Sequence, residues 1–129
     1  MNEAVIFEPE DIISVYTRQQ AIEDGIFIDV SEVAKSLGFL ISVAITTNLY
    51  NTHIKKDEED RTINNLSVFL KKLRQKMEKD KSNDNLLYFQ FNFSGIFDPN
   101  DLTDVWVAFE AESPTNNSMA LNCFLPEDY

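Results

Sequence analysis

Residues 87–93 read Leu-Tyr-Phe-Gln-Phe-Asn-Phe, and this alternation of apolar and more polar side chains predicts a β-strand. The odd-numbered positions share one face of the strand, which we expect to be buried. Two more segments with strand character follow at residues 105–112 and 119–125, and turns rich in Asp, Pro and Asn separate them. Consecutive strands joined by short turns predict an antiparallel meander over residues 86–125.

The segment before the meander has the periodicity of a helix. Its apolar residues recur at spacings of three and four, which predicts one amphipathic stripe on a long helix over residues 57–81. We expect this stripe to pack against the phenylalanine face of residues 87–93. The stripe consists of Ile63, Leu66, Leu70, Leu73 and Met77.

Residues 1–56 contain signals for short helices. Thr17 followed by Gln20 is a capping box, in which each side chain satisfies a free backbone amide of the first turn. The β-branched and aromatic residues at 26–28 favour a brief extended segment after that helix. Three helices are expected in all, with N-caps at Thr17, at Ser31 and at Thr46 or Thr47, and with Gly25 and Gly38 ending the first two.

These elements predict an α+β fold in a single domain over residues 1–129. An antiparallel sheet of three or four strands should carry the helices on one face, the long basic helix among them. The fourth strand would be residues 12–16 at the edge of the sheet. A chain of this length can bury a core without disulfides, and its one cysteine, Cys123, is expected to be a small buried apolar side chain.

Residues 16–39 also form a motif, Y-T-R-Q-Q-A-I-E-D-G-I-F-I-D-V-S-E-V-A-K-S-L-G-F. It resembles the N-terminal signature of an uncharacterised bacterial family carried on plasmids, conjugative elements and phages. Members of that family open with Tyr-Ser/Thr-Arg-x-Gln-Ala-Ile-x-Asp-Gly, followed by Val-Asp-Val-Ser/Thr-Glu-x-Ala. The resemblance implies a mobile-element origin and no particular activity. The matching residues are Tyr16, Thr17, Arg18, Gln20, Ala21, Ile22, Asp24, Gly25, Asp29, Val30, Ser31, Glu32 and Ala34.

The polar motif residues Tyr16, Arg18, Asp24 and Asp29 have two interpretations. In the first, they only hold the short helices together, since most other matching residues have capping or packing roles. In the second, Arg18 or Asp24 lies on a working surface. The sequence leaves both open.

Charge divides the chain into three blocks. Residues 1–60 hold four Lys or Arg and twelve Asp or Glu, residues 61–81 hold seven and two, and residues 82–129 hold none and eight. The net charge of −11 therefore combines one basic helix with an acidic body. Such a surface repels nucleic acid and attracts basic partners, unless the acidity serves only solubility.

The sequence contains no recognisable catalytic motif. Its three glycines form no phosphate-binding loop, and a single His with a single Cys argues against a zinc site. His53 is expected to be an ordinary histidine on the surface of a helix or in helix packing, with a general base paired to an acid such as Asp57 as the alternative. The oxygen-rich stretch at residues 98–104 departs from the spacing of an EF-hand loop and favours a plain turn. We therefore expect no enzyme, no cofactor and no metal.

Hydropathy indicates a cytoplasmic protein. No stretch approaches the roughly 18 consecutive apolar residues of a membrane span. Residues 1–11 are acidic, whereas the start of a signal peptide is basic.

The first functional hypothesis is an inhibitory or adaptor protein of a mobile element, of the anti-CRISPR or antirestriction type. Enzymes that handle nucleic acid hold it in channels lined by Lys and Arg, and a rigid acidic surface can occupy such a channel in place of phosphates. The expected partner is a CRISPR or restriction nuclease of the host, with no membrane and no direct nucleic-acid binding. The expected binding residues are Trp106 as an aromatic anchor with Glu110, Glu112, Asp101 and Asp104, and Glu127 and Asp128 in the tail.

The second hypothesis is an accessory protein that binds phosphate through the long basic helix. Aromatic residues on the sheet, such as Tyr88 and Trp106, would then stack on bases. The same helix could instead dock on the acidic sheet of a second copy and form a homodimer. The basic surface consists of Lys71, Lys72, Arg74 and Lys76.

Overall fold

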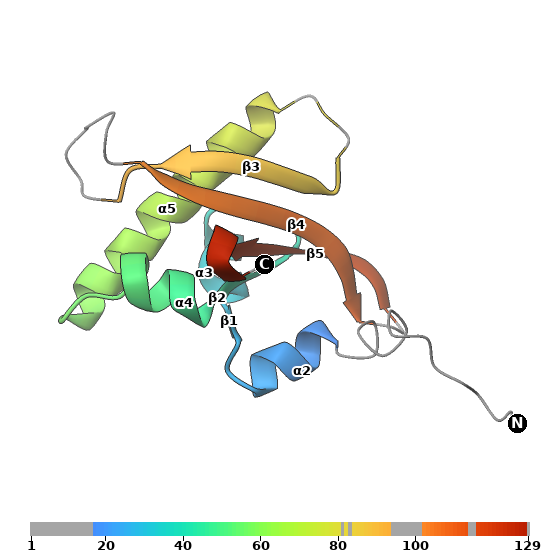
Figure 1. The fold of residues 1–129 in the computed structure, drawn as a ribbon, viewed down its shortest axis with the longest axis horizontal. Helices are drawn as coiled ribbons and strands as arrows, with labels where there is room; N and C mark the ends of the chain where they lie inside the picture. The colour runs from blue at the N-terminus through green and yellow to red at the C-terminus, as the bar shows by residue number, and fades with distance from the viewer. Residues whose placement is uncertain (1–16, 81, 83, 94–101, 114–115, 129) are drawn as a thin grey trace, which may run out of the picture.

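The computed structural model describes residues 17–80, 82, 84–93, 102–113 and 116–128, without the side chains of residues 112, 113, 116 and 117. Within this part of the chain, five strands form one sheet in the order β1-β2-β5-β4-β3 (Figure 1). The strands are β1 (Phe27–Asp29), β2 (Ser42–Thr46), β3 (Leu86–Phe91), β4 (Thr103–Ser113) and β5 (Asn116–Phe124). The helical elements are α2 (Arg18–Glu23), α3 (Ser31–Ser36), α4 (Thr47–Leu49), the π-helical turn η1 (Tyr50–Ile54), α5 (Glu59–Lys79) and the 3-10 turn η2 (Pro126–Asp128).

The expected α+β class, the long helix and the antiparallel pairing of β3, β4 and β5 are confirmed. The expectation of a three- or four-stranded, wholly antiparallel sheet is wrong. β2 pairs with β5 in parallel and β1 pairs with β2 in antiparallel fashion, so the sheet is mixed. Ser42–Thr46 escaped prediction because a short apolar run does not distinguish a buried strand from a helix start. The strand expected at residues 12–16 lies outside the described residues.

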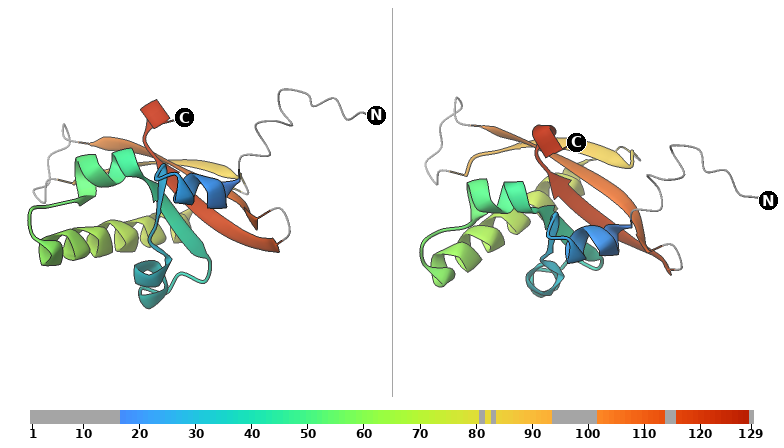
Figure 2. Two further views of the ribbon diagram at one scale, coloured as in Figure 1. Left: turned by 90° about the horizontal axis from the view of Figure 1, so that it is seen from below. Right: turned by 60° about the horizontal axis from the view of Figure 1, so that its bottom comes forward.

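The sheet has two unlike faces. Helices α3, α4 and α5 pack on one, which we call the inner face, and α2 and η2 lie on the other, the outer face; Figure 2 shows α5 and η2 on opposite sides of the sheet. Alternation along the strands places the core residues on the inner face. Those from the strands are Val43, Ile45, Leu87, Phe91, Val105, Val107, Leu121 and Cys123.

The apolar stripe of α5 packs on the inner face largely as expected. Leu66, Leu70 and Leu73 are buried and Met77 is partly buried. Including Ile63 in the stripe was wrong, because its side chain is 47% exposed. Thr62 takes the core-facing position of the first turn instead, where its Oγ1 accepts a hydrogen bond from Lys56 N at 2.8 Å.

Seven residues after Thr62, on the same side of the helix, Phe69 is 2% exposed. Its ring centroid lies 4.9 Å from that of Phe91. The contact between α5 and β3 is therefore more aromatic than the leucine stripe predicts. Of the strand phenylalanines, Phe91 is fully buried, while Phe89 and Phe93 lie at the margin of the core.

The helix ends follow local sequence with one exception. The capping box of α2 is present, with Gln20 N donating to Thr17 Oγ1 and Thr17 N donating to Gln20 Oε1. Gly25 follows the helix at φ +79°, a conformation that glycine adopts at low cost. Thr46 caps α4 by accepting a hydrogen bond from Leu49 N at 3.1 Å.

The exception is Ser31, whose expected role as N-cap of α3 is wrong. The N-cap position is Val30, which makes no side-chain capping bond. Ser31 Oγ instead donates to Asp29 Oδ1 and accepts a hydrogen bond from Val43 N at 3.0 Å. Ser31 therefore bonds β2, a strand that the sequence does not predict, and it attaches α3 to the sheet. Gly38 follows α3 at φ +99°, as predicted.

Candidate functional site

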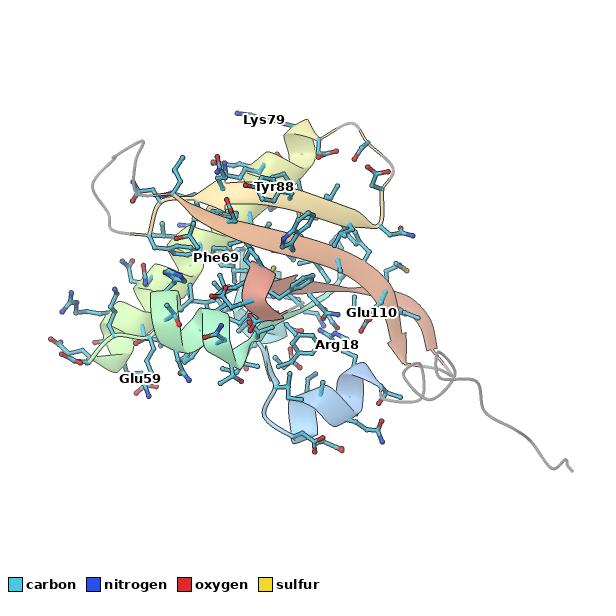
Figure 3. The ribbon with its side chains drawn as sticks, viewed as in Figure 1. Arg18, Glu59, Phe69, Lys79, Tyr88 and Glu110 are labelled. Atoms are coloured by element: carbon cyan, nitrogen blue, oxygen red, sulfur yellow. The ribbon has the colours of Figure 1, made fainter. Side chains whose placement is uncertain are left out.

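Three aromatic side chains cross the outer face in one row: Tyr88 on β3, Trp106 on β4 and Phe124 on β5. The strand register pairs Tyr88 with Trp106, and Trp106 with Phe124. The Tyr88 and Trp106 rings meet edge to face with centroids 5.1 Å apart. Tyr88 is 45% exposed, and the other two are partly exposed. We call these three residues the aromatic row, and Figure 3 shows Tyr88 at its β3 end.

An ionised carboxylate is fixed beside the aromatic row. Tyr88 Oη donates a hydrogen bond to Asp104 Oδ1, and Gln90 Nε2 donates to the same oxygen at 3.1 Å. The hydrogen bond from Tyr88 and, to a smaller extent, the one from Gln90 lower the pKa of Asp104 below its ordinary value. The same bond raises the pKa of Tyr88, because the phenol proton is shared with a carboxylate. Asp104 therefore carries its negative charge in one orientation at neutral pH.

A hollow of about 370 Å³ lies beyond Phe124, at the other end of the row. Its walls come from the start of β1, the end of β2, α4 and the C-terminal turn. A hollow of this size is in the range of small-molecule and side-chain pockets. It is lined by Ile26, Phe27, Thr46, Thr47, Asn48, Phe124 and Asp128.

Asp128 closes the C-terminal side of this hollow. Its carboxylate accepts hydrogen bonds from Thr46 Oγ1 at 2.7 Å, from Leu125 N at 3.0 Å and from Asn48 Nδ2 at 3.1 Å. These bonds attach η2 to the junction of β2 and α4. Phe124 belongs to both the aromatic row and the lining of the hollow, so the two form one continuous surface, and the Asp128 hydrogen bonds fix its C-terminal side.

Where α2 packs on β5, the outer face carries a buried arginine. Arg18 is only 8% exposed, and its Nε donates to Asn122 Oδ1 on β5 at 2.8 Å. Its Nη2 is buried, and within the described part of the chain it has no hydrogen-bond partner. Glu110, which is exposed, pairs in register with Ala120, two residues before Asn122, so it lies at this same end of the sheet. Figure 3 labels both Arg18 and Glu110.

The expected partner-binding residues are only partly described. Asp104, Trp106 and Glu110 lie on the outer side of β4, because alternate residues of a strand share a face. Asp101 and the side chain of Glu112 lie outside the described residues. Sequence reasoning missed Phe124 and the hollow, since their place beside Trp106 depends on the register of β5 and on β2.

The expected basic surface is divided by the structure. Lys72 and Lys76 lie beside β3, where Lys72 Nζ donates to the Asn92 carbonyl at 3.5 Å and Lys76 Nζ lies 5.3 Å from the centroid of the Phe91 ring. Arg74 points elsewhere: it pairs with Glu78 at 3.4 Å, and its guanidinium packs against Gly38. Lys71 is exposed and does not line the groove that Lys72 and Lys76 share.

That groove is a second hollow, of about 300 Å³, between α5 and the edge of β3. It brings three lysines of α5 together with polar and apolar residues at the end of β3 and next to the start of β4. We call it the α5–β3 groove. It is lined by Lys72, Gln75, Lys76, Lys79, Gln90, Phe91, Asn92 and Leu102.

The polar motif residues have local contacts where the structure describes them. Arg18 connects α2 to β5, and Asp24 occupies the C-cap position of α2. Asp29 accepts a hydrogen bond from Ser31 N at 2.9 Å at the start of α3. Tyr16 lies outside the described residues. The contacts of Arg18 and Asp29 fit the interpretation that the motif holds short elements together.

The remaining candidate groups have packing environments. The His53 ring stacks on Phe93 with centroids 4.8 Å apart. Cys123 is fully buried as expected, and burial raises the pKa of its thiol far above the ordinary value. Across residues 17–80, 82, 84–93, 102–113 and 116–128, no three His, Cys, Asp or Glu side chains gather in a way that could hold a metal ion. Residues 98–101 of the oxygen-rich stretch lie outside these ranges.

No helix in the described part of the chain is long and apolar enough to cross a membrane. The chain matches no curated protein and no solved structure. Residues 1–119 match a family of unknown function, DUF6573. The matched segment contains α2 to β4 and the start of β5, and it ends before Phe124 and Asp128. With more than nine-tenths of its length inside the match, the chain belongs to the DUF6573 family.

Proposed function

We propose that this protein is a binding protein that uses the outer face of its sheet to occupy a basic surface of a nucleic-acid-handling partner. The observation that carries the proposal is the aromatic row, Tyr88, Trp106 and Phe124, which is at least partly exposed and lies between carboxylates held by hydrogen bonds. Tyrosine and tryptophan are enriched in the energetic centres of protein interfaces. Carboxylates around such a centre favour a partner with Lys and Arg at the matching positions.

The charge of the outer face supports a protein partner over nucleic acid. An exposed aromatic row can stack on bases, but strands β3, β4 and β5 contain no Lys or Arg. Asp104 beside Trp106, Glu110 at one end and Asp128 at the other would all repel phosphates. The same carboxylates can replace phosphates in a Lys- and Arg-lined channel.

The sequence motif at residues 16–39 resembles that of a family from plasmids and phages, which often meet host defence nucleases. We therefore propose a CRISPR or restriction nuclease as the partner, with inhibition by exclusion of its nucleic acid.

The test is affinity capture with the tagged full-length chain, followed by competition. The captured partner should be a nucleic-acid-binding protein, and its own nucleic acid should displace it from the chain. Glu110→Lys should lower capture strongly, because the exposed carboxylate would become a cation facing cations. Glu32→Lys is the matched control, since Glu32 is exposed on α3, on the inner side of the sheet. A partner that still binds its nucleic acid while attached to the chain would refute the proposal.

The α5–β3 groove supports a second candidate, the nucleic-acid accessory protein, because three lysines converge there. Under that alternative, Lys72→Glu with Lys76→Glu should abolish binding to nucleic acid, and Glu110→Lys should not weaken it. The two candidates therefore respond to opposite variants.

A further inference from the structure

Among the described residues β3 is an edge strand of the sheet, and its outer edge carries backbone groups that could pair with another strand. Phe109 N donates to the Asn85 carbonyl at 2.9 Å, so this pair belongs to the hydrogen-bonded set of the β3–β4 ladder. Such pairs alternate in an antiparallel ladder. The odd-numbered residues of β3 therefore bond β4, and the N–H and C=O groups of Leu86, Tyr88 and Gln90 point away from it. Within the described part of the chain these outward groups meet no backbone partner.

The α5–β3 groove runs along the same edge. Lys72, Lys76 and Lys79 on α5 line it with Gln90 and Phe91 on β3. Lys72 reaches the strand edge itself, through its hydrogen bond to the Asn92 carbonyl. The outer edge of β3, which pairs with no other described strand, therefore lies beside a row of cations, and an occupant would contact both.

We propose that the α5–β3 groove binds an extended acidic segment of another protein, which adds to the sheet as a sixth strand beside β3. The added strand would pair with the outward backbone groups of Leu86, Tyr88 and Gln90, as in other cases of strand addition. Every second side chain of that strand would point to the inner side, toward α5. Carboxylates at those positions would meet the lysines.

The spacing of the lysines suits this occupant. Lys72 and Lys76 are one helical turn apart, about 6 Å along the axis. Alternate side chains on one face of a strand are about 6.7 Å apart. Acidic residues at every second position would therefore lie near successive lysines. Lysines beside an open edge also discourage pairing with neutral or basic strands, which gives the groove its selectivity.

Charge and backbone together favour a peptide over nucleic acid. The chain carries a net charge of −11, so a polyanion of high charge density is repelled by most of its surface. A peptide with a few carboxylates suffers less repulsion. It also satisfies the strand edge, which phosphates cannot do in a regular ladder.

The test uses the full-length chain and a blocked decapeptide of alternating Thr and Glu. Binding should protect the Tyr88 and Gln90 amide protons from hydrogen exchange, measured by NMR. The decapeptide of alternating Thr and Gln, with the same backbone and no charge, should bind at least about tenfold more weakly. Lys72→Glu with Lys76→Glu should weaken the Thr-Glu peptide by at least about tenfold. Lys35→Glu with Lys71→Glu, the same charge change at exposed positions outside the groove, should have an effect below about twofold.

Four results would overturn the proposal. The first is equal peptide affinity of the groove variant and the parent, and the second is binding without protection of the Tyr88 and Gln90 amides. The third is tighter binding of single-stranded oligothymidine than of the Thr-Glu peptide at the same lysines, which would assign the groove to nucleic acid. The fourth is a dimer of the chain in sedimentation that the groove variant dissociates, which would make a second copy the occupant.

Discussion

The outer face of the sheet and the α5–β3 groove meet along β3, yet they offer opposite chemistry. Tyr88 and Gln90 direct their side chains to the outer face, where both bond Asp104, while the groove beside the same strand is lined by three lysines. The strands and loops after residue 82 supply only acids, and α5 supplies most of the bases. The total charge of −11 therefore describes neither surface. A partner is selected by the local arrangement, and the two surfaces should bind different partners.

The largest effect should come from the core that both surfaces share. Leu70→Ala or Phe91→Ala should lower the free energy of unfolding by about 2–5 kcal/mol, since both side chains are buried between α5 and the sheet. Ile63→Ala, on the exposed side of α5, should change it by no more than about 0.5 kcal/mol. Urea denaturation followed by circular dichroism measures all three. Equal losses at Ile63 and Leu70 would contradict the observed orientation of the helix.

The next effect should separate the two surfaces. Trp106→Ala should weaken binding of the partner captured through the outer face by about 2 kcal/mol, or roughly 30-fold, as at other aromatic interface centres. Lys72→Glu with Lys76→Glu should leave that affinity unchanged. Isothermal titration of the purified partner measures both variants. If the lysine variant loses affinity and the Trp106 variant retains it, the groove is the site of that partner.

The features of the two surfaces that depend on residues close together in the chain could be predicted from the sequence. The capping box at Thr17 and Gln20, the period-two pattern of β3 and β4 and the helical stripe of α5 depend on neighbours close in the chain. They placed Trp106 and Glu110 on one side of β4. The parallel pairing of β2 with β5 depends on contacts about eighty residues apart, and no local signal specifies it. The hollow beside Phe124 follows from that pairing, and the hydrogen bond between Val43 N and Ser31 Oγ depends on β2, so neither was predicted from the sequence.

A smaller effect should come from the buried end of the outer face. Arg18→Met should cost about 1–3 kcal/mol of unfolding free energy, because Asn122 Oδ1 loses its donor inside the protein. Adding Asn122→Leu should recover part of this loss, since apolar replacement of both polar partners is often close to neutral. The comparison is a double-mutant cycle by urea denaturation. Additive losses in the double variant would show that the two side chains are not coupled.

The smallest effect should be a shift in the titration of Asp104, which tests whether Tyr88 and Gln90 hold its carboxylate in place. Hydrogen bonds from Tyr88 and then Gln90 lower the pKa of Asp104, so their stabilisation is present above the ordinary carboxyl pKa and is lost as pH falls through the folded value. The raised pKa of Tyr88 acts in the other direction, with stabilisation present below the ordinary phenol pKa and lost as pH rises through the folded value. Tyr88→Phe should therefore move the Asp104 midpoint upward in an NMR carboxyl titration, and Gln90→Leu should move it less. An unchanged midpoint in Tyr88→Phe would mean that the phenol does not hold the Asp104 carboxylate in solution. The charge beside Trp106 would then lack a fixed orientation, and nothing would distinguish it from the exposed carboxylates elsewhere on the chain.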